Sequence, residues 1–245
     1  MNKDEKKVFI SHSSKDIEIA NKLYDLLIAS GIDRERMYCS TIPEAGTSLG
    51  ESFVEDILDQ FHNYDLFGIL ILSKNYYSSP SCLNEMGMFL LQDHYWMVVT
   101  PDTPNQTING LIRKDVIRIE MGNGDSLFRF FELKNQLESF FETKLDSLKW
   151  CNRLMVLLRL YHPSLKSIRD VDTLSEILCH FVVNKKPISF KEITTLPHKK
   201  CVCETIAKYL QVLEELRLIN HREDCRGGIR RVFYSINPSI KPFIT

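Results

Sequence analysis

Short apolar runs alternate with helix-like patterns along the first half of the chain. The apolar runs are rich in β-branched, aliphatic and aromatic residues, as strands are. The expected strands are residues 6–11, 36–40, 64–73, 95–100 and 115–120. The third of these, YDLFGILILS, is apolar without alternation, which is typical of a strand covered on both faces of a parallel sheet. The pattern therefore predicts βαβ units with right-handed crossovers and an open α/β sandwich.

Helical periodicity fills the gaps between these runs. Residues 17–31, residues 51–63 and the segment around Glu85 each predict a helix, and Gly31 predicts the end of the first one. A longer helical zone extends from Asp125 to about Leu160. We expect this zone to cover the sheet and then to continue as a connector.

The pattern changes at Tyr161–Ser164, because Pro163 disfavours helical geometry in the residue before it. Three shorter helical segments and two strands follow, and the strands flank a tight turn at Arg226-Gly227-Gly228. This order resembles that of winged helix-turn-helix domains. The predicted division is a first domain at 1–160, a linker at 161–167 and a winged-helix domain at 168–245.

Within the predicted winged-helix domain, four aliphatic side chains should form one edge of the core: Leu213, Leu216, Leu218 and Ile219. Three arginines should lie on the wing: Arg226, Arg230 and Arg231. The two predicted domains also differ in charge. Residues 1–167 carry 18 Lys and Arg against 23 Asp and Glu, a balance of −5, whereas the remainder carries 13 against 9, a balance of +4. This asymmetry predicts different partners for the two domains.

Composition limits the class of protein. A chain of 245 residues that is 44% hydrophobic and 26% charged is typical of a soluble globular protein with an ample core. The apolar runs are much shorter than the roughly 20 residues of a membrane span. The N-terminal sequence MNKDEKKVFI lacks the apolar core of a signal peptide. These features predict a cytoplasmic protein without a membrane segment.

The seven cysteines are an odd number and lie mostly in apolar or helical stretches, which favours a reducing compartment over a disulfide framework. Cys201, Cys203, His198, His221 and Cys225 lie within a short span of sequence. Their spacing is less regular than that of structural zinc sites. We therefore expect inert thiols and no metal.

Four segments of the first domain carry a recognisable pattern. They are VFISHSSKD at 8–16, PEAGTSLGESF at 43–53, ILILSKNYYSS at 69–79 and SPSCLNE at 79–85. In order and spacing they resemble the Toll/interleukin-1 receptor (TIR) domain family over roughly residues 5–145. The resemblance implies a flavodoxin-like fold with a five-stranded parallel sheet. Ser79, Cys82 and Glu85 match the family's fourth motif, and Ser81 stands where a tryptophan is common.

In the branch of the family that cleaves NAD+, the glutamate at the position of Glu85 is essential, so the resemblance implies that Glu85 is catalytic. Other TIR domains act only by self-association. On its residue pattern alone, Glu85 is better explained as an acid at the start of a helix, stabilised by the helix dipole. The first loop lacks G-x-G-x-x-G, so NAD+ would be a substrate and no cofactor is expected.

Ligands of open α/β sheets bind beyond the carboxyl ends of the strands. Side chains that follow three of the predicted strands should therefore converge on one cleft and contact the substrate: Ser11, His12, Ser13, Ser40, Thr41, Lys74, Ser81 and Cys82. By resemblance, the loop from Ser40 to Leu49 would border the substrate and mediate contacts between TIR domains. A neighbouring molecule's loop could then supply the stacking surface that Ser81 lacks.

The resemblance thus implies an NAD+ hydrolase or ADP-ribosyl cyclase that serves bacterial antiphage defence, and we expect residues 168–245 to bind an activator or partner. Two alternatives stay open. One is a non-enzymatic TIR scaffold, which the serine at position 81 favours. The other is a transcription regulator whose winged helix binds nucleic acid.

Overall fold

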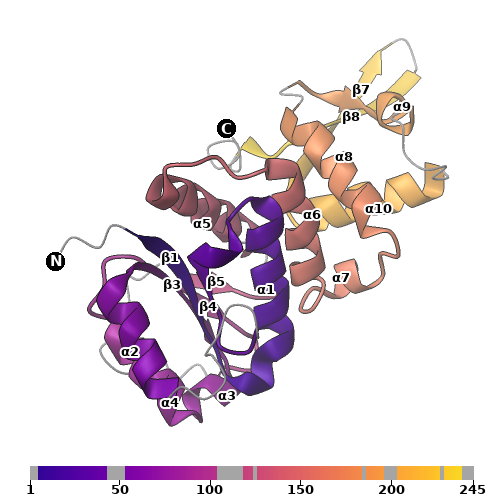
Figure 1. The fold of residues 1–245 in the computed structure, drawn as a ribbon. Helices are drawn as coiled ribbons and strands as arrows, with labels where there is room; N and C mark the ends of the chain where they lie inside the picture. Colours follow the sequence, from indigo (N-terminus) through magenta and orange to yellow (C-terminus); the bar gives the residue numbers. More distant parts are fainter. Residues whose placement is uncertain are drawn as a thin grey trace. The chain divides into compact units, whose positions relative to one another are not determined.

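The computed structural model divides the chain into two compact units, Met1–Leu145 and Asp146–Thr245 (Figure 1). The structure describes residues 5–42, 53–103, 118–123, 126–183, 186–195, 203–226 and 229–238. No helix in these ranges is both long enough and apolar enough to cross a bilayer.

The first unit contains a five-stranded sheet in the order β2-β1-β3-β4-β5, and every neighbouring pair is parallel. The strands are β1 (Lys6–Ser11), β2 (Met37–Tyr38), β3 (Asp65–Leu72), β4 (Tyr95–Val99) and β5 (Arg118–Glu120). In the central strand β3 every residue from Leu66 to Leu72 is buried, because helices cover both faces of the sheet. The predicted five-stranded parallel α/β fold is confirmed.

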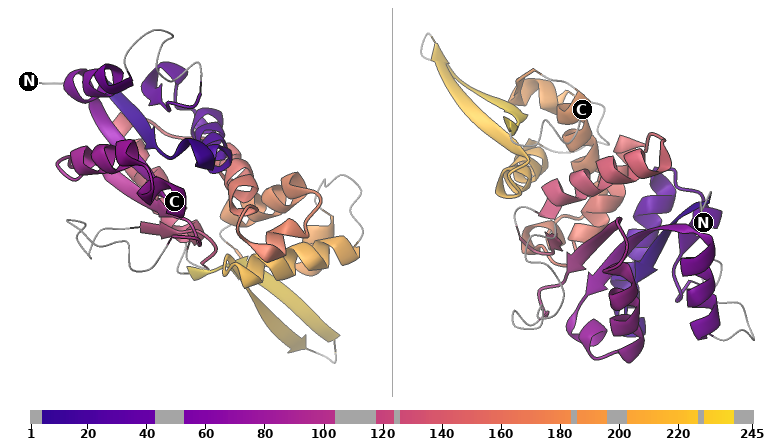
Figure 2. Two further views of the ribbon diagram at one scale, coloured as in Figure 1. Left: turned by 90° about the horizontal axis from the view of Figure 1, so that it is seen from below. Right: turned by 90° about the vertical axis from the view of Figure 1, so that its left-hand side faces the viewer.

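The described part of this unit contains five α-helices: α1 (Ile17–Ser30), α2 (Phe53–Asn63), α3 (Lys74–Tyr77), α4 (Pro80–Phe89) and α5 (Ser126–Phe141). As predicted, Gly31 ends α1, and its φ of 115° is one that glycine adopts readily. Helices α2, α3 and α4 pack on one face of the sheet, and α1 and α5 lie on the other (Figures 1 and 2).

Helix α4 lies unusually close to the sheet at Gly68. A Cβ atom at this position would come within 2.5 Å of the Phe89 ring. Phe89 also contacts the rings of Phe9 and Phe61, at centroid distances of 5.2 and 4.7 Å. This aromatic cluster fixes the depth at which α4 packs on β1 and β3.

The long helical zone predicted from Asp125 to Leu160 is two helices. The backbone leaves α5 at Glu142, whose φ is 55°. The buried Glu138 carboxylate accepts hydrogen bonds from Lys134 Nζ, from Lys144 Nζ at 3.0 Å and from the Leu145 backbone N–H at 3.0 Å. Helix α6 (Ser147–Leu158) then begins, capped by the side chain of Asp146.

The two compact units consequently divide at Leu145, whereas the sequence pattern placed the linker at 161–167. That expectation rested on Pro163. In the structure Pro163 opens the short helix α7 (Pro163–Lys166), and proline is well tolerated at the first position of a helix.

The second unit continues with α8 (Val171–Val183), β6 (Ile188–Ser189), α9 (Phe190–Thr194), α10 (Cys203–Glu215), β7 (Ile219–Arg226) and β8 (Ile229–Ile236). The three strands form an antiparallel sheet in the order β6-β8-β7. The helices and the hairpin follow the predicted order, and strand β6 is an addition. The predicted core edge is confirmed, since Leu213, Leu216, Leu218 and Ile219 are buried.

The predicted wing is described only in part. Arg226 pairs with Ile229 across the hairpin, whereas Gly227 and Gly228 lie outside the described residues. The side chains of Arg226 and Arg230 also lie outside the described part of the chain, and Arg231 is exposed.

Candidate active site

The candidate site lies at the carboxyl edge of the parallel sheet, where β1 and β3 end. Ser11 is the last residue of β1 and pairs with Leu70 of β3. Two serine caps then set the course of the chain beyond β3. Ser73 Oγ accepts a hydrogen bond from the Tyr76 backbone N–H and starts α3, and Ser79 Oγ accepts one from Cys82 and starts α4.

Glu85 lies beyond the first turn of α4, which contains no acidic residue. Its side chain is on the face of the helix that also buries Cys82 and Phe89. The alternative in which Glu85 is only a first-turn acid is therefore wrong. The exposed fraction of Glu85 is 6%, which is low for a carboxylate.

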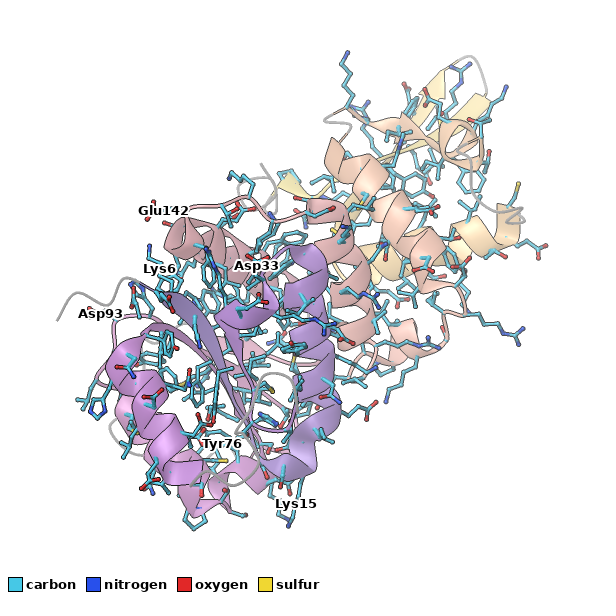
Figure 3. All side chains as sticks on the ribbon, in the orientation of Figure 1. Lys6, Lys15, Asp33, Tyr76, Asp93 and Glu142 are labelled. Atoms are coloured by element: carbon cyan, nitrogen blue, oxygen red, sulfur yellow. The ribbon has the colours of Figure 1, made fainter. Side chains whose placement is uncertain are left out.

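A chain of three side chains ends at Glu85. The Ser11 hydroxyl donates to Glu85 Oε2 at 2.5 Å, and the Tyr76 hydroxyl lies 2.8 Å from Ser11 Oγ. Tyr76 belongs to α3 and is 0% exposed, and Figure 3 shows it among the packed side chains of the first unit. No described residue donates a hydrogen bond to the second oxygen, Oε1.

Burial raises the pKa of Glu85 to about 7, and the hydrogen bond from Ser11 opposes part of this effect. Among the described residues, no lysine or arginine forms a salt bridge with Glu85. A buried carboxylate without a cationic partner is costly for the fold. Such a site favours a ligand that brings its own positive charge.

His12 connects the ends of β1 and β2. Its Nδ1 lies 3.2 Å from the carbonyl oxygen of Ile10, and its Nε2 lies 2.8 Å from Thr41 Oγ1. A carbonyl oxygen can only accept, so Nδ1 carries the proton and the neutral ring accepts at Nε2 from the Thr41 hydroxyl. Burial lowers the pKa of His12, which agrees with a neutral ring.

Asp16 connects the first loop to α3. Its carboxylate accepts hydrogen bonds from Ser73 Oγ at 2.5 Å and from Asn75 Nδ2 at 2.7 Å. Ser13, which was predicted to contact substrate, is 6% exposed and caps the short helix η1 (Ser14–Asp16). These bonds hold the loop after β1 against the loop after β3.

The structure brings together some of the predicted site residues and leaves others apart. Ser11 bonds to Glu85, and His12 bonds to Thr41. Cys82 is buried close to Glu85, and burial raises the pKa of its thiol to about 11. Lys74 and Ser81 are exposed and Ser40 is half-buried, and none of these three bonds to Glu85 within the described ranges. In these ranges no three His, Cys, Asp or Glu side chains are placed to bind a metal ion.

The sequence did not single out Tyr76 or Asp16. Tyr76 is followed by Tyr77, and the pattern does not distinguish the two rings, of which only the first reaches Ser11. Asp16 resembles an ordinary acid at the start of a helix. The pairing of Asp16 with residues more than fifty positions away depends on the parallel register of β1 and β3.

Comparison with known proteins agrees with this geometry. Residues 8–128 match the model of the TIR domain family. Residues 8–128 are a TIR domain. The matched region contains the parallel sheet from Val8 onward, the hydrogen-bonded chain at Glu85 and the Asp16 bonds.

The chain is also similar to uncharacterized protein YddK of Bacillus subtilis (strain 168). The two are 30% identical over 146 residues, which cover 60% of this chain and 53% of YddK. The match therefore spans about half the length of this relative. A structure of the Aeropyrum pernix Orc1 protein in complex with DNA aligns with 97% of this chain and 77% of its own, at 14% identity. Its TM-score of 0.24 is too low to indicate a shared fold.

Proposed function

We propose that the TIR domain cleaves NAD+ at the bond between nicotinamide and ribose, with Glu85 as the catalytic carboxylate. One observation carries this proposal. Glu85 is buried at the carboxyl edge of the sheet, one of its oxygens is held by Ser11, and no described cation neutralises it. The nicotinamide of NAD+ is a pyridinium cation, so this substrate supplies the missing positive charge.

The arrangement suits the chemistry of this bond. Its two electrons leave with nicotinamide, which departs neutral, and the ribose becomes an oxocarbenium-like cation. No acid is needed to protonate the leaving group, whereas ordinary glycosidases require a pair of carboxyl groups. A carboxylate fixed in a water-poor site can stabilise the growing charge on the ribose. Glu85 Oε1 would hold the ribose hydroxyls, because Oε2 is occupied by Ser11.

The oxocarbenium ion can be captured in two ways. Addition of water, with loss of a proton, gives ADP-ribose. Attack by a nucleophilic atom of the same nucleotide gives a cyclic product. The proposed role is in bacterial antiphage defence, either by depletion of NAD+ or by formation of a signal nucleotide, and NAD+ is a substrate and not a cofactor.

The protonation state of Glu85 near neutral pH also depends on the substrate. With a pKa of about 7, the carboxyl is only partly ionised near that pH. A bound pyridinium lowers the pKa of a neighbouring carboxyl, because opposite charges favour the ionised form. Binding of NAD+ would therefore place Glu85 in the state that the reaction requires.

One feature favours the alternative of a non-enzymatic TIR scaffold. Ser81, in the first turn of α4, is exposed and cannot provide the flat ring that the family's tryptophan would offer. For the enzyme, we propose instead that TIR domains self-associate and that the loop from Ser40 onward in a second copy supplies the missing ring. Residues 43–50 of this loop lie outside the described ranges.

We propose that residues 168–245 form a winged-helix module that binds an activator or another protein partner. The order of its helices and strands supports this proposal. Nucleic acid binding is less well supported, because the exposed residues of α10 include Glu204, Lys208, Gln211 and Glu215. Two acids against one lysine would repel the phosphates that dominate nucleic acid binding.

Release of nicotinamide from NAD+ tests the proposed reaction. Concentrated protein should release nicotinamide, and Glu85→Gln should lower kcat by at least about 100-fold, as loss of a preorganised charge does in other enzymes. Glu55→Gln changes an exposed acid on α2 and is the matched control, with activity expected to stay at the parent level. Activity that survives Glu85→Gln contradicts the mechanism. An inactive parent, at high concentration and with self-association intact, favours the scaffold.

A further inference from the structure

We propose that Tyr76 and Ser11 are positioning residues, which act as a chain of two hydroxyls to hold Glu85 in one orientation and to favour its ionised form. On this view Ser11 does not contact the substrate, as the sequence suggested, but acts on it through Glu85. The catalytic part of this inference rests on the proposed function. The hydrogen-bond chain itself does not.

The direction of the two hydrogen bonds follows from the number of protons. An ionised carboxylate only accepts, so the single hydroxyl proton of Ser11 is donated to Glu85 Oε2. With its proton donated to Glu85, Ser11 Oγ can only accept a hydrogen bond from Tyr76. The Tyr76 hydroxyl, 2.8 Å away, must therefore be the donor. Donation by Tyr76 polarises the serine hydroxyl and strengthens its bond to the carboxylate.

Both hydroxyls are fixed by rigid elements. Ser11 is 1% exposed and ends β1, in register with Leu70 of the neighbouring strand. The Tyr76 backbone N–H donates to Ser73 Oγ at 3.0 Å, and the Tyr76 ring is part of the core beneath α4. Neither hydroxyl can turn to bulk water without disturbing the sheet or α3. A site held in this way keeps its geometry.

No other described titratable group near Glu85 favours its ionised form in place of the two hydroxyls. Among the described titratable groups, the charge of Glu85 acts on Cys39, Tyr76 and Cys82. Burial raises the pKa of both thiols to about 11 and that of Tyr76 well above its usual value, so all three are neutral near pH 7. From the first loop, His12 is neutral, and Asp16 is engaged with Ser73 and Asn75.

Three variants test the chain, and Tyr77 supplies the control. Ser11→Ala removes the donor to Glu85, Tyr76→Phe removes only the outer hydroxyl, and the double variant removes both. The buried Tyr77 hydroxyl has no hydrogen-bond partner in the described part of the chain, so Tyr77→Phe deletes a neighbouring hydroxyl without breaking the chain.

The first measurement does not depend on activity. Carbon-13 NMR of protein labelled at the glutamate carboxyl carbons follows the titration of Glu85, whose signal is the one lost in Glu85→Gln. We expect Ser11→Ala to raise the titration midpoint by about one unit, because a hydrogen bond to a charged group is lost. Tyr76→Phe should raise it less. The double variant should equal Ser11→Ala, since Tyr76 acts only through Ser11, and Tyr77→Phe should leave the midpoint unchanged.

The second measurement is the pH dependence of nicotinamide release. The acid limb of kcat/KM should move to higher pH in the same order as the NMR midpoints. KM above that limb should stay near the parent value, because Ser11 does not touch the substrate. A rise in KM with an unmoved acid limb would make Ser11 a substrate contact and overturn the proposal.

The outcomes separate the two proposals. An unchanged Glu85 midpoint in folded Ser11→Ala, or additive shifts in the double variant, overturns the hydroxyl chain whether or not the protein is active. Shifted midpoints in a protein that releases no nicotinamide support the chain and reject the proposed reaction. If Ser11→Ala does not fold, Tyr76→Phe alone decides, since an unmoved midpoint in that variant contradicts the chain.

Discussion

At the scale of single residues, the burial of Glu85 is a cost to the fold. Its pKa is about 7 in the folded chain, against 4.5 for an unperturbed carboxyl. Between these two values the unfolded state has lost the proton that the folded state retains. The free energy of unfolding therefore falls as the pH rises from about 4.5 to about 7, and stays low above that range.

Glu85→Gln should remove this dependence, because glutamine has nearly the same shape and no charge. We expect the variant to be more stable than the parent at about pH 8, by up to about 3 kcal/mol, and close to it at about pH 4. Urea unfolding at the two pH values measures the difference. Equal stability of parent and variant at the higher pH would show that Glu85 carries no burial cost.

At the scale of elements, the site depends on how deeply α4 packs on the sheet. The distance between α4 and β3 is set at Gly68, where no side chain separates the strand from the Phe89 ring. Phe89 lies one turn after Glu85 on the same helix face, so a shift of the ring also shifts the carboxylate. A change in the central strand can therefore alter the site without touching any of its polar atoms.

Gly68→Ala should lower the free energy of unfolding by about 1–3 kcal/mol, the usual cost of overpacking a core. It should also lower activity, because α4 must move away from Ser11. Gly87→Ala is the matched control on α4, since a Cβ there meets nothing within 4 Å. That variant should gain about 0.5–1 kcal/mol from the higher helix propensity of alanine. Thermal melts and nicotinamide release compare the two, and a neutral Gly68→Ala would contradict the role of this contact.

The elements were more predictable than the site. Unbroken apolar runs and Gly31 identified the parallel sheet and the end of α1, because burial and backbone geometry leave a local signal. The pairing of Ser11 with Tyr76, and of Asp16 with Ser73, leaves no such signal, since each joins residues that only the fold brings together. The end of α5 was missed because Glu138 caps it through residues further along the chain.

At the scale of the whole molecule, the chain is two compact units, and each contains one of the two tryptophans. Trp96 lies in β4, is 2% exposed and donates from Nε1 to Gln136 at 2.6 Å. Trp150 lies in α6 and is 0% exposed. Each ring is thus a buried reporter of its own unit.

Single-tryptophan variants should show whether the units unfold separately. Trp150→Phe leaves a reporter in the first unit, and Trp96→Phe leaves one in the second. Because each unit has its own core, we expect the fluorescence transitions of the two variants in urea to differ in midpoint. Circular dichroism of the parent, which has both tryptophans, should then show a broadened transition. Coincident transitions, with circular dichroism and fluorescence in agreement, would mean that the chain unfolds as one cooperative unit.

Because Glu85 has no cationic partner among the described residues, binding of a cation to it is coupled to the release of protons. A carboxyl that titrates near pH 7 is shared between two forms under ordinary conditions, so a cation that binds there must displace protons from part of the population. Acidification and a cationic ligand therefore compete for the same oxygen atoms. Averaged over the population, binding of a cation would release protons into the solution, and a fall in pH would weaken that binding.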